Sequence, residues 1–108
     1  MVGMKDSTVI DVVAHGADGN SYVLVMIEDR PWSTSPVQKH QLRQKFTLYG
    51  SYIVDGELGA TYPETVDKPI AVQLNCRTEP VGDILEIIET ARERLAEKNI
   101  PVLVHVYG

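Results

Sequence analysis

Residues 68–77 constrain the fold more than any other segment, because apolar side chains alternate there with small or polar ones. The apolar positions are Ile70, Val72, Leu74 and Cys76. Such a strand is buried on one face only, whereas the central strands of a doubly wound sheet are apolar on both faces. The pattern therefore predicts a two-layer protein with helices on one side of a sheet.

Two apolar segments near the start of the chain predict a β-hairpin. Residues 8–14 and 22–28 are rich in Val, Ile and Leu, and they flank the turn residues Asp18 and Gly19. Asp-Gly readily supplies the positive φ values that a tight reversal requires.

The next element is a helix that begins at Ser35. Ser35 is the expected N-cap, Pro36 the first helical residue, and Gln38 the partner that completes a capping box. Its apolar stripe is Leu42, Phe46, Tyr49 and Ile53, and Gly56 is the expected stop. Gly50, inside the helix, indicates either close packing against a neighbour or a slight bend. Residues 57–67 show no clear period and predict an ordered loop.

A second helix and a last strand complete the chain. The helix is expected to start at Thr78-Glu79-Pro80 and to end at Asn99, and residues 100–107 form the strand. The helix stripe is Val81, Ile84, Leu85, Ile88, Ala91 and Leu95.

The order ββαβαβ predicts one α/β domain over residues 1–108, a two-layer sandwich with a four-stranded mixed sheet. Two successive right-handed crossovers put both helices on the same face, and we expect the strand order 1-2-3-4. By parity, the helix side carries Ile10, Val12, Val23, Val25, Ile27, Ile70, Val72, Leu74, Val102, Val104 and Val106. The opposite side carries Asp11, Val13, His15, Tyr22, Leu24, Met26, Gln73, Asn75, Arg77, Leu103, His105 and Tyr107. That surface is too apolar to be purely solvated, which indicates either self-association or cover by residues 57–67.

Charge and composition exclude several classes of protein. The formal net charge of −5 argues against a nucleic-acid binder, which needs excess Lys and Arg. No apolar run reaches the roughly 20 residues of a membrane span, and residues 1–6 lack the apolar region typical of a signal peptide, so we expect a cytoplasmic protein. The single cysteine, Cys76, predicts a buried thiol. Basic residues at the start of the first helix are interpreted as a solvated face: Lys39, His40, Arg43 and Lys45.

Phosphate-binding glycine loops, HExxH, CxxC and GxSxG are all absent from the sequence. No cofactor and no metal site is therefore expected. The best set of chemical groups is Asp11, His15, Arg77, His105 and Tyr107. If these side chains converge, they could bind a small molecule or act in catalysis. A histidine beside Asp11 would be the general base, Arg77 would hold an anionic group, and Tyr107 would donate a proton. A role as surface or interface residues is the favoured interpretation.

The leading functional hypothesis is a non-enzymatic interaction protein, expected to be a homodimer or to bind another protein. Its contact residues would be Tyr22, Leu24, Met26, Trp32 and Leu103. Trp32 either anchors a partner or folds back to close the core. RNA binding is disfavoured, because the sheet offers few aromatic side chains in an acidic protein.

Several short motifs resemble an uncharacterised family of small bacterial proteins of unknown function. They are Val9-Ile10-Asp11, Asp18-Gly19, Glu28-Asp29 with Trp32, His40 with Leu42, Gln44-Lys45 with Tyr49, Gly56-Glu57-Leu58 and Tyr62-Pro63. The resemblance implies a bacterial cytoplasmic protein and carries no catalytic residues. It directs attention to the corner between the hairpin and the first helix, and to the loop that follows the helix.

Overall fold

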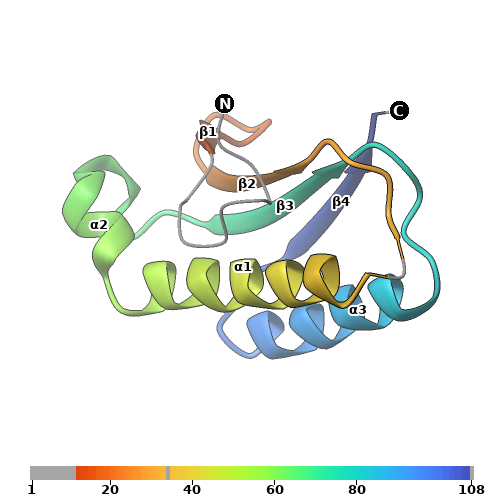
Figure 1. Ribbon diagram of the computed structural model, residues 1–108. Helices are drawn as coiled ribbons and strands as arrows, with labels where there is room; N and C mark the ends of the chain where they lie inside the picture. The colour runs from red at the N-terminus through yellow and green to blue at the C-terminus, as the bar shows by residue number, and fades with distance from the viewer. Residues whose placement is uncertain (1–11, 34, 108) are drawn as a thin grey trace.

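The computed structural model describes residues 12–33 and 35–107, which form a four-stranded sheet with two long helices against one face (Figure 1). The strands are β1 (Val12–His15), β2 (Tyr22–Glu28), β3 (Ile70–Cys76) and β4 (Val102–Val106). The helices are α1 (Pro36–Val54), the short α2 (Glu57–Thr61), the 3-10 turn η1 (Pro63–Thr65) and α3 (Gly82–Ala96). The two-layer α/β architecture and the ββαβαβ order of the main elements are confirmed.

The strands follow one another across the sheet in the order β1-β2-β3-β4, as predicted. β1 is antiparallel to β2, whereas β2, β3 and β4 are parallel. At the hairpin turn, Asp18 Oδ1 accepts hydrogen bonds from the backbone N–H groups of Asn20 and Ser21, at 2.9 and 3.0 Å. Gly19 has a φ of +71°, so the predicted Asp-Gly turn is confirmed. Residues 8–11 of the predicted first strand lie outside the described residues.

The predicted facing of the hairpin strands is wrong. Leu24 and Met26 have no exposed surface and lie opposite Val72 and Leu74 of β3, on the helix side. Consequently Val12, Val23, Val25 and Ile27 face away from the helices. The physical reason is that β2 is apolar at every position from 23 to 27, so its sequence has no alternation to reveal the buried face.

α1 begins as expected, with Ser35 as N-cap and Pro36 in the first turn. The Ser35 hydroxyl accepts a hydrogen bond from the N–H of Val37 at 3.2 Å. The predicted capping box does not form, because the Gln38 side chain bonds to residues before the helix instead of to Ser35. The predicted stripe is confirmed: Leu42, Phe46 and Tyr49 are buried and Ile53 packs against them.

α3 starts later than predicted, at Gly82, with Val81 as its N-cap. Val81 and Leu85, expected in the apolar stripe, are 65% and 45% exposed, whereas Ile87 is buried. A Cβ built on Gly50 would lie 3.0 Å from Cδ2 of Leu95, so the glycine in α1 permits close packing against α3.

The segment predicted as a loop, residues 57–67, contains α2 and η1. Gly56, with a φ of +86°, separates α1 from α2. Leu58 of α2 joins the core between the sheet and the helices. Figure 1 places α2 beside the end of α1, so this segment does not cover the other face of the sheet.

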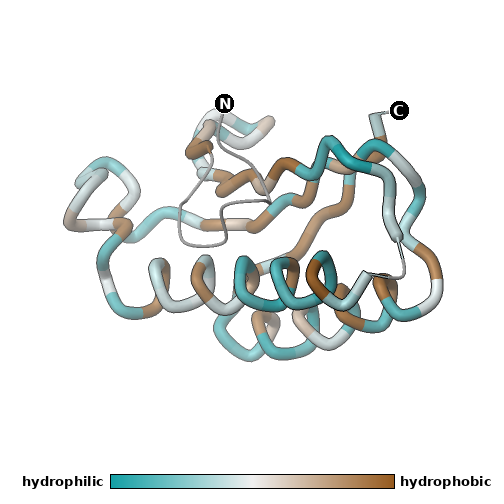
Figure 2. Tube along the Cα trace, in the orientation of Figure 1, coloured by the Kyte–Doolittle hydropathy of each residue, from teal (hydrophilic) through white to brown (hydrophobic). Residues whose placement is uncertain are grey.

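Hydropathy follows this layering. Figure 2 shows strands that are mostly hydrophobic and helices that alternate between hydrophobic and hydrophilic residues. Of the helices in the described ranges, none is both long enough and apolar enough to cross a membrane.

Candidate functional site

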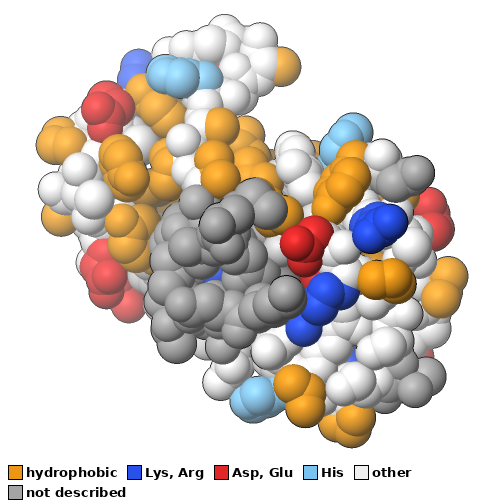
Figure 3. Space-filling model, turned by 45° about the horizontal axis from the view of Figure 1, so that its top comes forward, with side chains coloured by type: hydrophobic (Ala, Val, Ile, Leu, Met, Phe, Trp, Pro, Cys, Tyr) orange, Lys and Arg blue, Asp and Glu red, His pale blue; other side chains and the backbone are white. Residues whose placement is uncertain are grey.

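The sheet surface opposite α1 and α3, called the open face below, is the main candidate for contact with another molecule. Its described strand residues are Val12, Ala14, Val23, Val25, Ile27, Ala71, Gln73, Asn75, Leu103 and His105. None of these ten side chains is Asp, Glu, Lys or Arg. Val12 and Leu103, on the two outer strands, are 40% and 45% exposed. Figure 3 shows hydrophobic side chains gathered below the hairpin tip, and acidic and basic side chains both near the middle of the view and at the outline of the molecule.

The five residues predicted to converge on a small molecule do not all meet. His15 pairs with Tyr22, which lies opposite Ile70 at the start of β3, whereas His105 lies opposite Asn75 near the end of β3. Five strand residues separate these levels, or about 16 Å at 3.3 Å per residue. The prediction that the two histidines share a site is therefore wrong.

The remaining members of that set have different outcomes. Arg77 is exposed directly after β3, and Tyr107 follows β4 with its N–H bonded to the Cys76 carbonyl at 3.0 Å. The backbone thus brings Arg77, His105 and Tyr107 to the same end of the sheet. Asp11 lies outside the described residues.

The predicted contact residues divide in a similar way. Leu24 and Met26 are fully buried under the helices, so their assignment to an interaction surface is wrong. Tyr22 is partly buried, with its ring 4.9 Å from that of His15. Leu103 is exposed on the open face, as the interaction hypothesis requires.

Trp32 folds back onto the protein. Its ring is partly buried against the core, its backbone N–H donates to Thr78 Oγ1 at 3.2 Å, and its Nε1–H donates to the Thr78 carbonyl at 2.9 Å. Trp32 was expected either to anchor a partner or to fold back and close the core, and the structure shows its ring packed against the core. These bonds join the linker after β2 to the linker after β3.

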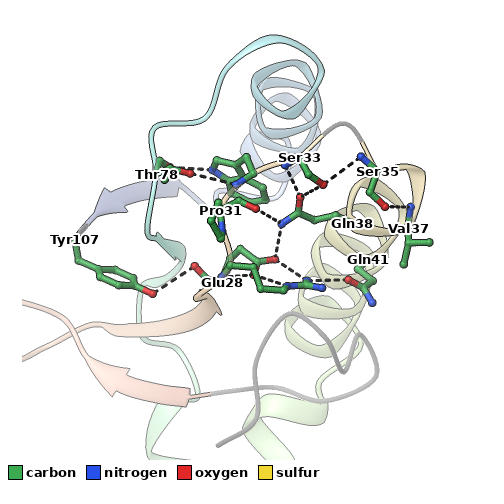
Figure 4. A network of polar contacts seen from close by, with 11 residues as sticks. Glu28, Pro31, Ser33, Ser35, Val37, Gln38, Gln41, Thr78 and Tyr107 are labelled. Atoms are coloured by element: carbon green, nitrogen blue, oxygen red, sulfur yellow. Dashed lines mark hydrogen bonds and ion pairs between the residues drawn. The ribbon is translucent and has the colours of Figure 1, made fainter.

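A polar network at the end of β2 centres on a carboxylate that has no exposed surface, Glu28 (Figure 4). The Arg30 guanidinium holds both of its oxygens at 2.8 Å, through Nε–H and Nη2–H. The Arg30 backbone N–H donates to the same carboxylate at 3.0 Å. Hydrogen bonding to Glu28 raises the pKa of Arg30 above its already high ordinary value, so the guanidinium stays protonated.

The network continues into α1. Gln38 Nε2 donates to Glu28 at 3.3 Å and to the Pro31 carbonyl at 3.2 Å, while its Oε1 accepts from the Ser33 N–H at 2.8 Å. Arg30 Nη2 also donates to Gln41 Oε1 at 2.9 Å. With these bonds the network fixes the corner between β2 and α1. Glu28 was missed at the sequence level, although its position two residues after Met26 places it on the same strand face.

Cys76 lies in the core, as expected. Burial raises the pKa of its thiol, which therefore remains protonated near neutral pH. Its Sγ lies 3.8 Å from the His105 carbonyl.

The basic start of α1 is not a uniform solvated face. Lys39 forms a 2.6 Å ion pair with Asp83 of α3, and this hydrogen bond lowers the pKa of Asp83. Lys45 has no exposed surface, and its Nζ lies 5.7 Å from the centre of the Tyr49 ring. Its assignment to a solvated face is wrong.

A groove of about 780 Å³ runs between α1 and α3 on their outer side. Arg43, Asp83, Glu86 and Arg94 place both signs of charge around it, over a floor that includes Phe46. This mixture of charges does not select one class of ligand.

The outer edge of β4 has backbone groups directed away from the sheet. The Val72 N–H donates to the Pro101 carbonyl, and the Tyr107 N–H to the Cys76 carbonyl. In a parallel pair this pattern turns alternate residues toward β3, so the backbone groups of residues 102, 104 and 106 point outward. Arg92 of α3 donates to the Val102 carbonyl at 3.2 and 3.3 Å.

Comparison with known protein families identifies the chain at the level of its family. A model of a family of unknown function, DUF6572, matches residues 2–108, so the protein belongs to that family. This confirms the resemblance to an uncharacterised family that its motifs indicated. No curated protein matches the chain, and no solved structure matches it.

Proposed function

We propose that the protein is a non-enzymatic interaction domain that self-associates through the sheet side of the molecule. The observation that carries the proposal is the absence of formal charge from the ten described strand residues of the open face, in a chain with a net charge of −5. Contact through charged faces would set like charges against each other, whereas an uncharged face avoids that repulsion.

Apolar exposure supports the same surface. Val12 and Leu103 present exposed aliphatic side chains at either side of the sheet, whereas Val23 and Ile27 between them are partly buried and Val25 is buried. The outer helix faces are different, because charged residues such as Glu86, Glu93 and Arg94 alternate there. Removing the exposed side chains of Val12 and Leu103 from water therefore gains apolar burial without removing the hydration of a charge.

Analytical ultracentrifugation of the wild type and of Leu103→Lys tests the proposal. We expect a wild-type dimer of twice the 12.0 kDa chain mass, and a monomer after a lysine is placed on the sheet side. Val37→Lys is the matched control, because Val37 is an exposed valine on α1, at 64%. A monomeric wild type at high micromolar concentration contradicts the proposal, and so does equal dissociation of both variants.

The alternative is a small-molecule binder that uses Arg77, His105 and Tyr107, which share one end of the sheet. Native mass spectrometry of protein purified gently from cells distinguishes the two functions. A reproducible small adduct that is lost in Arg77→Ala and Tyr107→Phe favours the ligand, whereas a clean dimer without an adduct favours self-association.

A further inference from the structure

The edge of β4 is a strand surface with hydrogen-bonding capacity that its own sheet does not use. Among the described residues, the outward N–H and C=O groups of Val104 and Val106 have no hydrogen-bond partner. Proteins usually protect such edges with prolines, charged residues or bulges. The β4 sequence, Val-Leu-Val-His-Val, contains none of these within the strand.

From this geometry we infer that two copies of the protein pair along β4, antiparallel, to form one continuous eight-stranded sheet. The inference rests on the proposed self-association, but it places the contact along the β4 edge of the sheet and leaves the open face uncovered. A two-fold axis beside Val104 places this residue opposite Val104 of the partner subunit. The same axis places Val102 opposite Val106 of the partner subunit, so the outward groups of Val104 and Val106 that lack a partner within the protein face backbone groups of the other strand.

The side chains of β4 suit this self-pairing. On the open face, Leu103 would lie opposite His105 of the partner subunit, and on the helix side valine would face valine. Like charges directly opposite each other destabilise an antiparallel pair, and this pairing creates none between the two β4 strands. The Val102 carbonyl already accepts two hydrogen bonds from Arg92, at 3.2 and 3.3 Å, so the guanidinium must give up one of them when the partner strand pairs there.

α3 adds apolar surface on the same side of the molecule. Arg92 reaches the start of β4, and Leu85 lies seven residues earlier, on the same helix face. Seven helical residues span about 10.5 Å, close to the roughly 13 Å from Val102 to Val106, so Leu85 lies level with the second half of the strand. Leu85 and Val106 are 45% and 38% exposed, and pairing along β4 would shield both.

A second copy is favoured over a strand from another protein because the junction is self-complementary. The β4 edge of each copy presents both the N–H donors and the C=O acceptors that the other copy needs. Pairing also places the uncharged open faces of the two subunits side by side in one sheet. Association in two-fold dimers is the commonest arrangement of soluble homo-oligomers.

Val104→Pro tests the inference directly. The N–H of Val104 points away from β3, so proline removes no bond within the sheet but prevents pairing with another strand. Val13→Pro is the matched control on the opposite edge: Val13 is also a partly buried valine, and its backbone points away from β2. We expect Val104→Pro to raise the dimer dissociation constant at least about tenfold and Val13→Pro to change it by less than about threefold. Circular dichroism spectra of both variants, compared with the wild type, test whether each variant remains folded.

Amide hydrogen exchange provides a measurement on the wild type that needs no variant. The amides of Val104 and Val106 should become more protected as protein concentration rises, whereas the amide of Val13 should not. Unchanged exchange at all three positions, in a sample that ultracentrifugation shows to be dimeric, overturns edge pairing.

The outcomes also separate this inference from the proposed function. If Leu103→Lys dissociates the dimer but Val104→Pro does not, the copies associate through the open face and the β4 pairing is wrong. A wild type that is monomeric throughout removes both the proposed function and the inference. If β4 amides become protected only when another protein is added, the partner is not a second copy and the inference is wrong.

Discussion

Gly50 of α1 and Leu95 of α3 are in such close contact that a Cβ atom on the glycine would lie 3.0 Å from Cδ2 of the leucine. The two helices therefore approach each other at a point where one of them has no side chain. Near their N-termini the same helices are joined by the ion pair between Lys39 and Asp83.

Replacing Gly50 by leucine should lower the free energy of unfolding by about 1–3 kcal/mol, because the larger side chain must displace Leu95. Gly50→Ala should be close to neutral, since the gain in helix propensity of up to about 1 kcal/mol offsets a small adjustment of Leu95. Urea denaturation measures both. Ser51→Leu, at an exposed neighbouring position, is the control, and an equal loss in Ser51→Leu and Gly50→Leu would show that the close contact is unimportant.

Arg30→Met should destabilise the protein by about 2–4 kcal/mol, because it leaves the Glu28 carboxylate buried without its cation. The loss should fall toward the lower value, since the side chain of Arg30 is 30% exposed and Gln38 still donates to the carboxylate. Lys39→Met is the control, because its partner Asp83 is 66% exposed and such pairs contribute less than about 1 kcal/mol. Thermal unfolding of both variants is the measurement, and equal melting temperatures would refute the role of the buried pair.

The Cys76 thiol should react with dithiodipyridine at least about tenfold more slowly in the folded protein than in urea, because the reactive thiolate is both buried and disfavoured. Burial raises the pKa of this thiol, so moderate alkalinity should restore little reactivity in the folded state. The absorbance of released thiopyridone follows the reaction. Rapid modification of the folded protein at neutral pH would place Cys76 outside the core.

Stability should decrease as the pH falls through the acidic range. Hydrogen bonds from the Asn20 backbone and the Ser21 side chain lower the pKa of Asp18, and the bond from Lys39 lowers the pKa of Asp83. A carboxyl group whose folded pKa is lowered stabilises the fold above its unfolded pKa, near 3.9, and loses that contribution as the pH falls through the folded value. Side-chain NMR titration should find midpoints below about 3.9 for both residues, and a midpoint at or above that value would contradict the hydrogen bonding of the turn or of the ion pair.

The architecture was predictable because β3 and α1 carry clear periods. The alternation in β3 revealed which of its faces is buried, and Leu42, Phe46 and Tyr49 marked the buried face of α1. β2 has no such alternation, so its orientation depends on pairing with β3 and was assigned to the wrong face. The burial of Leu24 and Met26 is thus a consequence of tertiary register, which local sequence does not contain.

The candidate surfaces were harder to predict for a related reason. Leu103 could be placed on the open face because the last strand follows β3 in parallel. The separation of His15 from His105 depends on the ends of the strands at which they lie, and the Glu28 network depends on a guanidinium two residues further along the chain. The spacing of side chains along a strand predicts which of them share a face. It does not predict which residues from other segments pack around a charged group such as the Glu28 carboxylate.

The strand order carries a consequence for how the protein can be made. Each strand pairs with the one synthesised before it, so no strand has to be inserted between two that are already joined. During synthesis the sheet can therefore form by adding each new strand to the same edge, from β1 to β4. β4 is the last strand added, so its outer edge is left without a neighbouring strand. In the inferred dimer, β4 of a second copy fills that place through backbone hydrogen bonds.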